Sequence, residues 1–126
     1  MRNTYVPYPV RIKDVIVESE DKSLRSYWLE FLNAADAKAF DYLPGQFAEL
    51  SVAGLGEIPI GIASSPTEGD DLLFTVNRVG SVTTKLHTMG PGDIMGVRGP
   101  LGNSYPLKAM EGKNIVIVAG GFAVTT

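Results

Sequence analysis

The residues best suited to hold a ligand lie between positions 77 and 86 of the chain. A strand expected over 72–77 leads through Arg78 into a short helix that is expected to begin at Ser81. The first N–H groups of a helix lack intrahelical acceptors and carry roughly half a positive charge, so they can bind a phosphate. Ser81 is a good N-cap, and Arg78 and Lys85 add positive charge. The pattern indicates an anion site, although an ordinary helix cap shows the same residues.

Length, composition and charge limit the class of protein. The 126 residues are 44% apolar and 20% charged, which is typical of a globular domain with its own core. A net charge of −3 argues against a general nucleic-acid binder, because such proteins carry clustered Lys and Arg. The chain has no cysteine and one histidine, which excludes disulfides and thiolate-held metal clusters within it. Any redox chemistry therefore needs an organic cofactor.

The sequence carries no signal for a membrane. No apolar run approaches the roughly 20 residues that span a bilayer, and the first residues do not lead into a signal-peptide core. We therefore expect no membrane span and a cytoplasmic location.

The elements that must position the anion site are short strands. Alternating apolar and polar residues between turn signals predict strands over 10–17, 25–31, 46–52, 59–63, 72–77 and 94–98. Residues 34–39 are alanine-rich and can form one helical turn, to which we assign no function. Six short strands and one short helix predict a mainly β fold, a closed antiparallel barrel over residues 1–110.

The pattern changes after residue 110. Ile115–Ala119 is uniformly apolar, as a strand buried on both faces of a parallel sheet would be, and Gly120-Gly121 is typical of a turn into a nucleotide-facing helix. A parallel sheet needs crossovers of a dozen or more residues, for which the sequence has no room. Residues 111–126 are therefore expected to begin an incomplete α/β nucleotide-binding domain. A strand that completes a sheet supplied elsewhere is the alternative.

Five short motifs occur in an order that resembles the ferredoxin–NADP reductase superfamily. The likeness is strongest to its electron-transfer subunits, which include the sulfhydrogenase gamma subunit and the electron-transfer subunits of anaerobic sulfite reductase and of dihydroorotate dehydrogenase. It covers nearly the whole chain. The motifs are Pro44-Gly45-Gln46-Phe47, residues 58–66, residues 78–83, Gly99-Pro100-Leu101-Gly102 and Val118-Ala119-Gly120-Gly121.

The resemblance implies both a fold and a function. In that family a six-stranded antiparallel Greek-key barrel holds FAD, and an NAD(P)-binding domain follows it. This implies an FAD-binding domain of an oxidoreductase that passes electrons between NAD(P)H and a redox partner subunit, such as an iron–sulfur protein or a hydrogenase or reductase complex. NAD(P) would bind only in a full-length form, and the 126 residues alone would not oxidise NADH. The flavin carries the chemistry, so no residue is expected to be catalytic.

The same resemblance implies the cofactor-binding residues. Ile58–Gly61 occupies the family's Arg-Pro-Tyr-Ser position and keeps only the proline; Ile60 offers the ring an apolar face and Gly61 only a backbone N–H. The pyrophosphate would then rely on Arg78 and the helix start. The expected set is Pro59, Ile60, Gly61 and Ile62 at the ring, Asn77, Arg78 and Val79 at the ribityl and phosphate region, and Gly80, Ser81, Val82 and Thr83 at the pyrophosphate.

Other interpretations start from the same residues. The missing Arg, Tyr and Ser side chains favour a flavin-free barrel that serves as a docking module in a redox complex. An oligonucleotide-binding barrel shares the architecture but lacks a basic aromatic face. Ser64 and Ser65 lack a His/Asp arrangement for nucleophilic catalysis, and His87 is expected to be structural. Scattered carboxylates predict no metal site.

Overall fold

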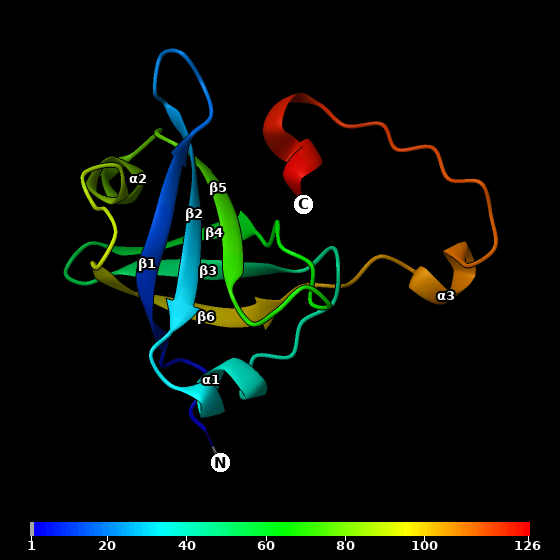
Figure 1. The fold of residues 1–126 in the computed structure, drawn as a ribbon, viewed down its shortest axis with the longest axis horizontal. Helices are drawn as coiled ribbons and strands as arrows, with labels where there is room; N and C mark the ends of the chain where they lie inside the picture. Colours follow the sequence, from blue (N-terminus) through cyan, green and yellow to red (C-terminus); the bar gives the residue numbers. More distant parts are fainter. Residues whose placement is uncertain (1) are drawn as a thin grey trace.

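The computed structural model of the chain describes residues 2–126, most of which form one antiparallel sheet (Figure 1). Six strands run in the sheet order β4-β3-β6-β1-β2-β5, which confirms the predicted mainly β fold with six antiparallel strands. The strands are β1 (Tyr8–Val17), β2 (Leu24–Phe31), β3 (Phe47–Val52), β4 (Gly56–Gly61), β5 (Leu72–Asn77) and β6 (Ile94–Leu101).

The two ends of the sheet approach each other without a ladder. β4 and β5 are the terminal strands of the order. Just beyond β4, the Ala63 N–H donates to Leu73 O at 2.8 Å, and the Leu73 N–H donates to the Ser64 hydroxyl at 3.1 Å. Among residues 2–126 no β4–β5 strand pairing is present, so the closed barrel stays a prediction.

The core lies on the concave side of this curved sheet. Side chains alternate along each strand, so every second residue points inward. Tyr27 on β2, Leu50 on β3 and Phe74 on β5 are fully buried in this cluster, together with Leu86. Burial of each such side chain stabilises the fold by about 1.5–3 kcal/mol. The positions of β4 and β5 relative to the helix that carries Leu86 are therefore fixed by packing.

The structure has more helical segments than the one that the sequence predicts. They are α1 (Ala34–Ala39), α2 (Ser81–Leu86), α3 (Leu107–Met110) and a 3-10 turn, η1 (Gly121–Thr125). α1 forms because Asn33 caps it, accepting the Asp36 N–H on its side-chain oxygen at 2.8 Å. α3 is a single turn that follows Pro106. The expectation of one short helix is therefore wrong.

The strand expected over Ile115–Ala119 is also wrong for the chain as it stands. These residues are extended but belong to no strand, and Val116, Ile117 and Val118 are 87%, 79% and 94% exposed. Figure 1 shows this segment looping away from the sheet between α3 and η1. A β-strand needs a neighbour that accepts and donates its backbone hydrogen bonds, and here none lies beside it. The domain boundary near residue 110 stays a prediction.

No α-helix in the described part of the chain is long and apolar enough to cross a bilayer.

Candidate functional site

The anion-site residues leave the sheet at the end of β5. Asn77 pairs with Leu24 of β2, and the next N–H, that of Arg78, donates to Ser23 O at 2.9 Å. This backbone bond holds residue 78 against the β1–β2 hairpin, while the Arg78 side chain is exposed. The sheet therefore presents a guanidinium group to solvent immediately before α2.

Thr83, rather than the expected Ser81, caps the start of α2. The structure places Gly80 at the N-cap and Ser81 inside the helix. Because Gly80 has no side chain, the hydroxyl of Thr83 reaches back: it accepts from Val79 N–H and Gly80 N–H at 2.9 Å each and donates to Gly80 O at 3.1 Å. Thr83 is 4% exposed, so the capping bonds are sheltered from water.

The capping leaves a compact set of free donors. The first α-helical bond runs from Thr84 N–H to Gly80 O at 2.8 Å. Within residues 2–126 the N–H groups of Ser81, Val82 and Thr83 have no protein acceptor. Together with Arg78, these groups form a positively polarised surface that suits a pyrophosphate.

Packing fixes α2 against the sheet. Leu86 is fully buried, and its carbonyl accepts from the Tyr27 hydroxyl at 3.2 Å. His87 Nδ1 lies 2.9 Å from Thr83 O and Nε2 lies 2.9 Å from Ser23 O, so the ring joins α2 to the hairpin. The structural role expected of His87 is confirmed.

We expect Thr83→Val to destabilise the protein while keeping the shape of the side chain. The valine removes the acceptor of two N–H groups, and loss of a helix cap costs typically about 1 kcal/mol. Thr83→Ser, which keeps the hydroxyl, should remain close to the wild type. Urea denaturation of the three proteins checks this; equal stability of the valine and serine variants would contradict the capping role.

The ring-side residues lie on β4, beside α2. Ile60 packs partly against the core, and Ile62 is 4% exposed within it. Pro59 and Gly61 alternate with them and face the other side of the strand. Ile60 can therefore offer a ligand only its exposed part, and Ile62 only its backbone.

Asn77 lines a hollow of about 420 Å³ that sequence reasoning did not anticipate. The β1–β2 hairpin supplies most of the wall, and Phe122 of η1 closes it, although the two are distant in the sequence. Nothing in the sequence marks Phe122 as part of this region. The lining residues are Ser19, Glu20, Asp21, Ser23, Leu24, Asn77 and Phe122.

The hairpin that holds Arg78 should lose stability in strong acid. The Ser19 hydroxyl donates to Asp21 Oδ1 at 2.6 Å, and the N–H and hydroxyl of Ser23 donate to the same oxygen. These bonds lower the pKa of Asp21 from 3.8 to about 2. The folded state therefore binds this proton only at lower pH than the unfolded chain. The stability is fully present above about pH 4 and is lost as the pH falls towards 2. Denaturation midpoints of Asp21→Asn and wild type should converge over that range; a constant difference would contradict the assignment.

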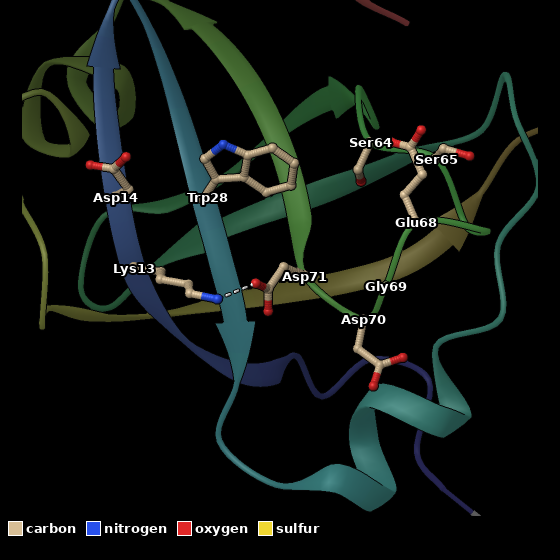
Figure 2. A pocket seen from close by; sticks show the side chains of 9 residues that line it. All are labelled: Lys13, Asp14, Trp28, Ser64, Ser65, Glu68, Gly69, Asp70 and Asp71. Carbon is tan, nitrogen blue, oxygen red and sulfur yellow. Dashed lines mark hydrogen bonds and ion pairs between the residues drawn. The ribbon is translucent and has the colours of Figure 1, made fainter.

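A second cavity, of about 370 Å³, has the wrong charge for the cofactor. It lies between β1, β2 and the loop after β4, and Figure 2 shows the indole of Trp28 among carboxylates of Asp14, Glu68 and Asp70. Lys13 Nζ contacts Asp71 Oδ2 at 2.6 Å, which raises the pKa of Lys13 through that hydrogen bond. None of the residues expected to bind FAD lines this cavity. Its anionic lining would repel a pyrophosphate.

The chain is similar in sequence to subunits of archaeal redox complexes. It is 39% identical over 122 residues to sulfhydrogenase 2 subunit gamma of Pyrococcus furiosus, covering 97% of this chain and 41% of that protein. It is 38% identical over 116 residues to the probable electron transfer subunit of dihydroorotate dehydrogenase B (NAD(+)) of Methanocaldococcus jannaschii, covering 91% and 38%. The chain thus spans about two fifths of these relatives. No protein-family model matches it.

Solved structures share the fold. An NADH-dependent reduced ferredoxin-NADP oxidoreductase matches with a TM-score of 0.62 and 25% identity, covering 83% of this chain and 36% of that one. The ferredoxin-NADP+ reductase of Plasmodium falciparum matches with a TM-score of 0.64 and 18% identity over 83% and 43%. The reductase of Neisseria gonorrhoeae, solved with bound FAD and NADP, matches with a TM-score of 0.63 and 19% identity over 79% and 40%. The last two likenesses concern the fold alone.

Proposed function

We propose that this chain, a ferredoxin–NADP reductase-like FAD-binding domain homologous to the sulfhydrogenase gamma and dihydroorotate dehydrogenase electron-transfer subunits, binds FAD and serves in electron transfer. The observation that carries the proposal is the start of α2. There three N–H groups without protein acceptors lie beside the exposed Arg78. The fold brings this surface next to β4, where the flavin ring is proposed to lie.

The residues present fit the dinucleotide in charge and in shape. The phosphates would be held by Arg78 and by the N–H groups of residues 81–83. On β4 the cradle consists of exposed Pro59 and the side-chain-free Gly61, with Ile60 partly exposed beside them. Asn77, Val79 and Gly80 would face the ribityl and phosphate region. Ser81 is exposed, so its hydroxyl can also serve there.

The proposed activity is electron transfer between NAD(P)H and a redox partner. Bound FAD supplies the chemistry, because it accepts a hydride and passes on single electrons. The chain's residues bind the dinucleotide and orient the ring. The partner would be an iron–sulfur protein or another subunit of a hydrogenase or reductase complex, since the relatives are named as subunits of such enzymes. NAD(P) binding would need a following domain, for which 111–126 is the proposed start. A cytoplasmic location stays a prediction.

The first test is the ultraviolet–visible spectrum of the freshly purified chain, followed by acid release and identification of any yellow cofactor. We expect FAD, either retained or taken up stoichiometrically when added to the colourless protein. FAD should also raise the denaturation midpoint, because a ligand that binds only the folded state stabilises it. A protein that neither contains nor takes up FAD would contradict the proposal.

The second candidate function is a flavin-free docking module. Ile58 carries no charge towards a phosphate, and Val116, Ile117 and Val118 expose a run of apolar surface of the kind that partner proteins cover. Arg78→Ala discriminates between the two functions. It should weaken FAD binding under the first and leave partner binding unchanged under both.

A further inference from the structure

The turn at the end of the described chain lies over the face of β4 that is proposed to hold the ring. In Figure 1 the red segment that contains η1 stands beside the end of β4. It contacts the sheet region at two places. Phe122 closes the hollow beside Leu24 and Asn77, and the Tyr105 hydroxyl donates to Thr126 O at 3.4 Å.

The second contact depends on a missing side chain. A Cβ atom at residue 61 would lie 2.8 Å from Cγ2 and 3.0 Å from Cβ of Thr126, and closer still to the Thr126 hydroxyl oxygen. Carbon atoms in ordinary contact are about 3.5–4.0 Å apart. Thr126 can therefore take its place only because residue 61 is glycine.

The hydroxyl that occupies this space is free to bind a ligand. The neighbouring Thr125 donates its hydroxyl to Phe122 O at 2.9 Å. In the part of the chain that the structure describes, no hydrogen bond involves the hydroxyl of Thr126, which is exposed. A hydroxyl can both donate and accept, which suits the polar edge of a heteroaromatic ring.

We propose that Thr126 Oγ1 is a hydrogen-bonding group of the cofactor site, held over Gly61 in the space that a side chain at that position would fill. This rests on the proposed FAD function and adds to it a positioning residue from outside the six-stranded sheet. The residue supplies the hydroxyl that β4 lacks at position 61, and it places η1 as a second wall of the site.

The test compares two adjacent threonines. FAD is titrated into the apoprotein of the wild type, Thr126→Ala, Thr126→Ser and Thr125→Ala, following flavin fluorescence and the visible spectrum. We expect Thr126→Ala to weaken FAD binding by about three- to tenfold, in line with the loss of one hydrogen bond, and to shift the absorption band of the bound flavin. Thr126→Ser and Thr125→Ala should behave as the wild type.

A second set of variants tests the seat of Thr126. Gly61→Ser should displace Thr126 and weaken FAD binding. Gly61→Ser combined with Thr126→Gly should restore it, because the new hydroxyl then has room. The Thr126 methyl resonance should shift in Gly61→Ser without any flavin, which reports the contact by itself. Equal binding by the wild type and Thr126→Ala would overturn this proposal alone. A wild type that takes up no FAD would instead overturn the proposed function, and this inference with it.

Discussion

Arg78→Ala should lower the affinity for FAD by tenfold or more. The guanidinium is exposed beside the three free N–H groups of α2, and residue 58, where the resemblance implies a second arginine, is isoleucine. Loss of a hydrogen bond to a charged phosphate costs about 1.5–3 kcal/mol, which corresponds to roughly ten- to a hundredfold in dissociation constant. The fold should be unaffected, because the contact of residue 78 with Ser23 O is made by the backbone N–H, which alanine keeps.

A matched control separates local contact from overall charge. Lys38→Ala removes the same charge from an exposed position on α1, which packs against β2 and not against β4 or α2. It should leave FAD binding within about twofold at physiological salt, where charges more than about 8 Å apart are largely screened. Arg78→Lys should lie between the two, because it keeps the charge but loses the planar fork. Equal affinities of the Arg78 and Lys38 variants would show that the pyrophosphate is held elsewhere.

The strands were predictable because their pattern is local. Each inward face alternates with a polar one, and turn residues such as Pro44-Gly45 mark the boundaries, so all six strands were placed to within a few residues. The family resemblance was confirmed for the same reason, since the motifs that carry it lie at the ends of these strands. The anion-site residues were identified correctly as a loop followed by a short helix.

The parts that the sequence did not predict depend on contacts between distant residues. Ser81 has the better N-cap side chain, yet the buried hydroxyl of Thr83 captures the two preceding N–H groups instead. The apolar run after residue 114 has strand composition but no neighbouring strand, and composition alone cannot supply one. The contact of Thr126 with Gly61 joins positions 65 residues apart in sequence number, 126 minus 61, and no periodicity reports it.

Leu86→Ala should have the largest effect on stability. Leu86 is fully buried in the main core, and truncation of a buried leucine to alanine costs about 2–5 kcal/mol, because it removes apolar contacts and leaves a cavity. The Tyr27 bond to residue 86 uses the backbone carbonyl and survives the change. We therefore expect a large fall in the urea midpoint with an unchanged denaturant slope.

The same substitution tests whether the core positions the anion site. Leu86 and Val82 are the buried apolar residues that hold α2, and the free N–H groups of residues 81–83 belong to that helix. A loosened helix would no longer hold these donors in place, so FAD binding should weaken even where the protein is still folded. Leu43→Ala is the control, since Leu43 is 51% exposed and its truncation should change stability by no more than about 0.5 kcal/mol. If Leu86→Ala lost stability while binding FAD as the wild type does, α2 would not be the element that holds the pyrophosphate.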